Sequence, residues 1–119
     1  MSEEANSRPR VLLGDLEPMV RVGMTRVLLD GGAEVLPDVG PEDGVVDRAA
    51  ADRPDVVVLA EWAWALSDAV RRAAPEAKLI VWASDESEMT VYDPGRAEPR
   101  RVQSAAPEAL VGELGASAP

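Results

Sequence analysis

Two short apolar runs constrain the fold of this chain most strongly. Val56 to Leu59 and Leu79 to Trp82 contain no polar residue and are rich in β-branched side chains. Runs of this length and composition are typical of strands buried on both faces of a sheet. Such strands belong to parallel sheets with helices packed on both sides, so the sequence predicts an α/β protein.

Helical patterns separate these runs from one another and from the rest of the chain. Apolar residues recur at helical spacing after Pro18, which suits a first helical turn, and the pattern stops at Gly31-Gly32. Shorter helices are predicted over Gly44 to Arg53, over Trp62 to Ala73 and over Pro107 to Leu114. In the first helix, the residues predicted to face inward are Val20, Met24, Val27 and Leu28.

Three weaker strands complete the expected sheet. They are Val11 to Leu13, Glu34 to Val39 and a short outer strand at Arg100 to Gln103. Pro37 cannot donate to a sheet ladder, so the second of these should lie at an edge. We expect a flavodoxin-like, doubly wound parallel sheet of five strands in the order 2-1-3-4-5. The domain would span residues 10–114, between flexible tails at residues 1–9 and 115–119.

Composition excludes several classes of function. The 119 residues suffice for one domain, and they include neither cysteine nor histidine. The chain therefore lacks disulfides, cysteine-based zinc sites and the commonest general base. A net charge of −10 disfavours direct binding to nucleic acid, and no apolar run approaches the ~20 residues of a membrane span. We expect a cytoplasmic protein that binds no membrane and no nucleic acid directly.

Four stretches resemble a known family in the order in which that family has them: Arg10 to Pro18, Arg53 to Leu59, Ala74 to Val81 and Ala106 to Leu110. Together they are similar to the receiver domains of bacterial response regulators, above all those of the LuxR/FixJ type. The resemblance implies a role in two-component signal transduction. It also implies that the loop before the third helix is shortened here, and that Asp93-Pro94-Gly95 disrupts the fourth helix.

The resemblance places the chemical groups of a receiver on residues that mostly cannot act. The metal-binding acidic pair falls on Asp15 and Leu16, and the phosphoryl acceptor falls on Ala60. The phosphate-sensing hydroxyl falls on Ala83, and the phosphate-pairing lysine falls on Gln103. The methyl group of Ala60 can neither attack phosphorus nor bind a metal, and Asp15 alone is a poor Mg²⁺ site. We therefore expect a degenerate receiver pocket with no metal, no cofactor and no enzymatic activity.

The leading hypothesis is a stand-alone pseudo-receiver: a phosphorylation-independent protein–protein interaction module in bacterial signalling or transcriptional control. Candidate partner contacts are Trp64, Tyr92 and Arg100. Trp64 lies off the apolar stripe predicted for its helix, which consists of Trp62, Ala65, Leu66, Ala69, Val70 and Ala73, and Arg100 falls on the family's aromatic switch position. Trp64 could equally pack under a loop, and Tyr92 could anchor the adjacent turn.

Two alternatives remain open at this stage. The first is a small-molecule sensor that uses the apolar pocket left around Ala60, Ala83 and Trp82, at the strand ends where such sheets bind ligands. The second concerns assembly: homodimerisation through the disrupted fourth-helix region is compatible with the sequence. The partner, the pathway and the extent of the whole protein are not fixed by these residues.

Overall fold

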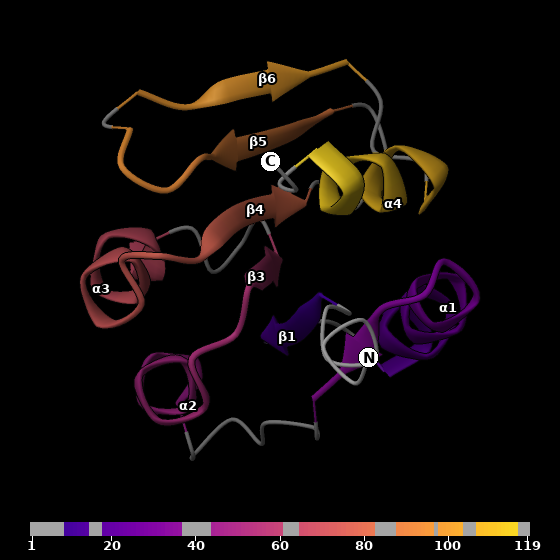
Figure 1. Ribbon diagram of the computed structural model, residues 1–119, viewed down its shortest axis with the longest axis horizontal. Coiled ribbons are helices and arrows are strands. Elements are labelled where there is room, and N and C mark those ends of the chain that lie inside the picture. The colour runs from indigo at the N-terminus through magenta and orange to yellow at the C-terminus, as the bar shows by residue number, and fades with distance from the viewer. Residues whose placement is uncertain are drawn as a thin grey trace, which may run out of the picture.

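The computed structural model describes residues 9–14, 18–36, 44–60, 65–82, 88–96, 98–103 and 107–116. Within these ranges the chain forms a six-stranded mixed sheet with helices on both faces (Figure 1). The elements, in chain order, are β1 (Arg10–Gly14), α1 (Pro18–Asp30), β2 (Glu34–Val35), α2 (Val45–Asp52), β3 (Val56–Ala60), α3 (Ser67–Ala73), β4 (Lys78–Trp82), β5 (Met89–Tyr92), β6 (Arg100–Val102) and α4 (Pro107–Ala116).

The α/β class is confirmed, but the predicted strand count and order are wrong. The sheet has the order β2-β1-β3-β4-β5-β6. β1 to β4 pair with one another in parallel, whereas β5 pairs antiparallel with both β4 and β6. Both continuous apolar runs lie in the middle of the sheet, where β3 is buried along its whole length. β2 lies at an edge, as Pro37 predicted, and among the described residues it pairs with β1 over Glu34 and Val35. The architecture is compatible with a flavodoxin-like fold.

The difference arises at β5, an extra strand that runs antiparallel between β4 and β6. Its four residues, Met89 to Tyr92, alternate between buried and half-buried, which is the pattern of a strand with one better-covered face. Leu79 on β4 is paired with Tyr92, and Val91 is paired with Arg100 on β6. The Asp93-Pro94-Gly95 turn thus leads from one antiparallel strand to the next, instead of disrupting a helix. The predicted fifth strand is β6, at the far edge.

Two apolar layers cover the two faces of the sheet. α1 and α4 lie on one face, and α2 and α3 on the other (Figure 1). Because alternate strand residues point to opposite faces, the buried side chains divide into two clusters. The first holds Val11, Leu13, Met24, Leu28, Val56, Val58, Ala60, Ile80, Trp82, Met89, Val91, Leu110 and Leu114. The second holds Leu12, Leu36, Val45, Ala49, Val57, Leu59, Val70 and Leu79.

The helices follow the predicted periodicity with local exceptions. In α1, Met24 and Leu28 are buried as predicted, and the helix ends at Gly31-Gly32, where Gly32 adopts a positive φ of 93°. Ala33 donates its N–H to the carbonyl of Leu28, which satisfies an orphan acceptor of the last turn. In α2, Ala49 is buried and Ala50 is exposed. α4 extends to Ala116, two residues beyond its predicted end.

Candidate functional site

The predicted receiver pocket is described only in part. Ala60 ends β3 and is 7% exposed, and its register partner on β4 is Trp82. Both side chains belong to the same buried cluster, so Trp82 is a core residue as predicted. Hydrocarbon therefore occupies the position that the resemblance to receivers predicted for a phosphoryl acceptor. Four other predicted site residues lie outside the described residues: Asp15, Leu16, Trp64 and Ala83.

Gln103 lies far from Ala60. It follows β6 and is exposed, and β6 is three strands away from β3 in the sheet. Neighbouring strands lie about 4.8 Å apart, so roughly 14 Å separates the two strands. The insertion of β5 produces this separation. The structure therefore does not bring Gln103 next to the end of β3, where the resemblance would have it meet a phosphate.

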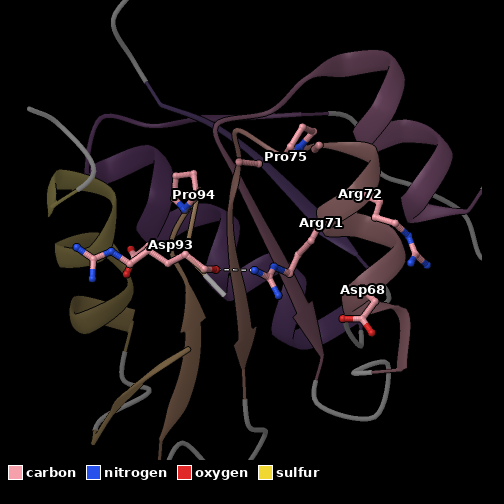
Figure 2. A pocket seen from close by; sticks show the side chains of 10 residues that line it. Asp68, Arg71, Arg72, Pro75, Asp93 and Pro94 are labelled. Carbon is pink, nitrogen blue, oxygen red and sulfur yellow. Dashed lines mark hydrogen bonds between the residues drawn. The ribbon is translucent and has the colours of Figure 1, made fainter. Parts of the chain in front are cut away.

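A cavity of about 430 Å³ lies between α3 and the turn that follows β5, near the start of β4 and so at the other end of the parallel strands from Ala60 (Figure 2). The Arg71 guanidinium lies 4.7 Å from the centroid of the Tyr92 ring and donates to the carbonyl of Arg96 at 2.6 Å. The ring of Tyr92 thus makes a cation–π contact with Arg71 within the chain. Figure 2 shows Arg71 directed toward the turn and Arg72 directed away from it, so these two cations do not converge on one ligand position.

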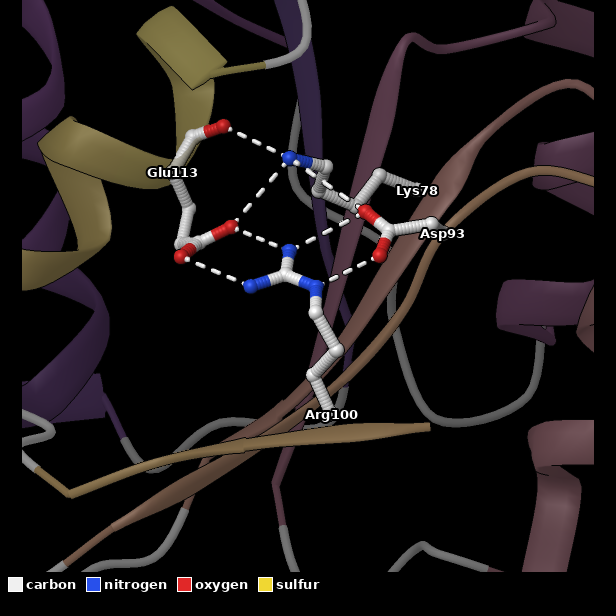
Figure 3. Close-up of polar contacts among 4 residues, drawn as sticks. All are labelled: Lys78, Asp93, Arg100 and Glu113. Atoms are coloured by element: carbon white, nitrogen blue, oxygen red, sulfur yellow. Dashed lines mark hydrogen bonds and ion pairs between the residues drawn. The ribbon is translucent and has the colours of Figure 1, made fainter. Parts of the chain in front are cut away.

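Four charged side chains form a network on the α4 face of the sheet (Figure 3). Lys78, the only lysine of the chain, is 2% exposed. Its Nζ donates to the backbone carbonyl of Glu113 at 2.8 Å and to Oε1 of the same residue at 3.2 Å, and it lies 3.7 Å from Asp93 Oδ1. Arg100 donates to Asp93 at 2.6 and 3.0 Å and to Glu113 Oε1 at 2.8 Å. The network joins β4, β6 and α4.

This network is electrically balanced and internal. The hydrogen bonds from Arg100 and the charges of Lys78 and Arg100 hold the pKa values of Asp93 and Glu113 below their ordinary range, against the opposing effect of burial. The same two carboxylates raise the pKa of Arg100. Arg100 was predicted to be a switch position and a partner contact, and its guanidinium makes ion pairs within the chain. The network fixes α4 on the sheet.

The lowered carboxylate pKa values predict an acid-sensitive contribution to stability. Groups whose pKa is depressed on folding stabilise the protein above their unfolded pKa, about 4 here, and lose that contribution as the pH falls through the folded values. Wild type should therefore be more stable than Arg100→Met near pH 7, and the difference should shrink below about pH 4. Urea unfolding of both proteins at several pH values measures it. A difference that persists undiminished in acid would contradict the prediction.

The outward side of α1 carries an unusual concentration of apolar side chains. Among the described residues, the exposed large hydrophobic side chains are Met19, Val22 and Leu29, with 87%, 70% and 54% of their surface accessible. Together with Arg26 they follow the spacing i, i+3, i+7, i+10, and so share one side of the helix, turned away from the buried Met24. We call these four residues the outer stripe.

A groove of about 370 Å³ adjoins the outer stripe on the side of β2. It is lined by Leu13, Arg21, Val22, Thr25, Leu29, Val35 and Leu36. Among the described residues that line it, none is acidic, although the whole chain has a net charge of −10. Sequence reasoning missed this surface because it assigned α1 one inward face. The available signal was that Met19, Val22 and Leu29 are apolar but lie off that face.

Comparison with known proteins finds no relative of this chain. No family model, no curated protein and no solved structure matches the chain. No helix within the described ranges is long and apolar enough to cross a membrane. The fold and the surface define the class of this protein: an α/β protein with a mixed sheet and an exposed apolar helix face. No family is shown for the chain.

Proposed function

We propose that this protein is a non-catalytic protein–protein interaction module that binds its partner through the outer stripe of α1. The observation that carries the proposal is that the exposed large hydrophobic side chains of the described chain all gather on this one helix face. Scattered apolar side chains are normal on a monomer, but a contiguous apolar surface marks a site of interaction. Its resemblance to receivers suggests a regulatory role in bacterial signalling or transcriptional control.

The end of β3 supports the phosphorylation-independent part of the proposal. Phosphoryl transfer needs an oxygen nucleophile, and Ala60 supplies a methyl group that packs with Trp82 in the core. The same packing weighs against the small-molecule alternative, because these two side chains fill space that a ligand would need. Incorporation of phosphate from acetyl phosphate and Mg²⁺ into an acidic side chain would contradict phosphorylation independence.

Affinity capture from a bacterial lysate tests the proposal. Val22→Glu places a charge in the outer stripe, and Ala50→Glu places one at an exposed helix position on the opposite face of the sheet. We expect wild type and Ala50→Glu to retain a common partner that Val22→Glu loses. Burying an unpaired carboxylate in an apolar interface should weaken binding by at least about tenfold.

Two outcomes would count against the proposal. Equal capture by all three proteins would move the contact to another surface, and Trp64→Ala would then test the contact predicted from the sequence. Capture of nothing above the level of an unrelated acidic protein would remove the interaction module itself. Thermal unfolding of the two variants controls for loss of fold, since both substitutions lie at exposed positions.

A further inference from the structure

We propose that the partner segment is an amphipathic helix that lies along α1 and places a carboxylate over Arg26. This inference rests on the proposed function and specifies the chemistry of the partner. It follows from the spacing of the outer stripe, from its charge and from the acidity of the rest of the chain.

The spacing of the outer stripe is that of a helix-packing seam. Met19, Val22, Arg26 and Leu29 are separated by three, four and three residues, which is the alternation of the a and d positions in a coiled coil. α1 has 13 residues and is about 20 Å long, so a partner helix of about three turns can contact the whole stripe. The groove toward β2 offers additional apolar surface beside Val22 and Leu29.

The charge of the outer stripe determines what the partner helix must carry. Arg26 is the only charged residue of the stripe, and none of the ion pairs among the described residues involves it. A helix that covers Val22 and Leu29 would also desolvate the guanidinium between them. A desolvated cation without a counter-charge is costly, so binding favours a carboxylate at that point.

A second copy of this chain fits the surface less well. The outer stripes of two copies would contribute two arginines, and neither stripe contains a carboxylate of its own. Two chains of net charge −10 also repel each other before contact. An apolar helix with a carboxylate at its centre avoids the first cost and packs its apolar face on the exposed apolar residues of α1.

Two synthetic helical peptides test the inference directly. Both have three heptads with leucine at the a and d positions, and they differ only at the central a position, which is Glu in one and Lys in the other. Fluorescence anisotropy at about physiological salt measures their binding to wild type and to Arg26→Glu. We expect wild type to prefer the Glu peptide by about tenfold, and Arg26→Glu to prefer the Lys peptide. The reversed preference also shows that the variant is folded.

Several results would overturn the inference. Equal binding of the two peptides would do so, and so would an unchanged preference in Arg26→Glu. Peptide binding that appears only after residues 1–8 are deleted would identify the chain's own N-terminal segment as the occupant. A wild-type dimer in sedimentation that Val22→Glu dissociates would identify a second copy instead. Loss of lysate capture with Val22→Glu, combined with no discrimination between the peptides, would leave the proposed function standing and reject only the acidic helix.

Discussion

Glu113→Leu should lower the free energy of unfolding by about 3 kcal/mol, the largest effect that we expect from a single charged residue of this chain. The substitution removes the side-chain acceptor nearest to the ammonium of Lys78, a residue that is 2% exposed. The carboxylate that remains is that of Asp93, whose Oδ1 lies 3.7 Å from Nζ. Removal of one partner from a buried ion pair typically costs about 3–5 kcal/mol, because the remaining charge stays desolvated. Urea unfolding of the purified variant measures the loss.

The double variant Lys78→Met/Glu113→Leu is the decisive control. It removes one cation and one anion, so that Asp93 and Arg100 remain as a balanced pair. Hydrophobic replacement of a whole buried pair is often close to neutral, and most of the lost stability should return. Arg100→Met should cost about 1 kcal/mol or less near neutral pH, because 46% of that side chain is exposed. Additive losses in the double variant would show that Lys78 and Glu113 are not coupled.

Gly14→Ala should lower the free energy of unfolding by about 2 kcal/mol. A Cβ atom at Gly14, the last residue of β1, would lie 2.6 Å from Cγ2 of Val45 and 3.0 Å from Cδ2 of Leu59. Both neighbours are buried side chains, so α2 would have to move away from the sheet, and overpacking of this kind costs about 1–3 kcal/mol. Thermal and urea unfolding measure the effect.

Gly23→Ala is the matched control for this prediction. A Cβ atom at Gly23, an exposed position in the middle of α1, meets nothing within 4 Å. Alanine is favoured over glycine inside a helix by about 0.5–1 kcal/mol, so this variant should be more stable than wild type. If Gly14→Ala were as stable as Gly23→Ala, α2 would not be packed against the end of β1 as tightly as the structure indicates.

Local sequence patterns were sufficient for the centre of this fold and insufficient for its edge. The apolar runs of β3 and β4 and the periodicity of α1 are signals that a single segment carries by itself, and the structure confirms all three. β5 has only four residues, and its pairing with β4 depends on residues seven to thirteen positions away. The resemblance to receivers added a bias, because it led us to interpret this region as a disrupted helix.

The charged network and the outer stripe differ in how far the sequence could reveal them. Lys78, Asp93, Arg100 and Glu113 have no regular spacing, and only the antiparallel strand brings Asp93 beside Lys78. No pattern in the sequence indicates that arrangement. The outer stripe was visible in principle, since α1 contains more apolar residues than one inward face requires. Its exposure became certain only when α4 and β2 were seen to cover the other sides of that helix.

The two edges of the sheet have a consequence for aggregation. β2 pairs over two residues, and β6 has three, of which Arg100 and Arg101 carry charge. Short or charged edge strands are poor templates for the addition of a strand from another molecule, so they guard a protein against growth into fibrils. Both edges of the described sheet are protected in this way. The exposed apolar face of α1 is therefore combined with a sheet whose described edges do not favour growth by strand addition.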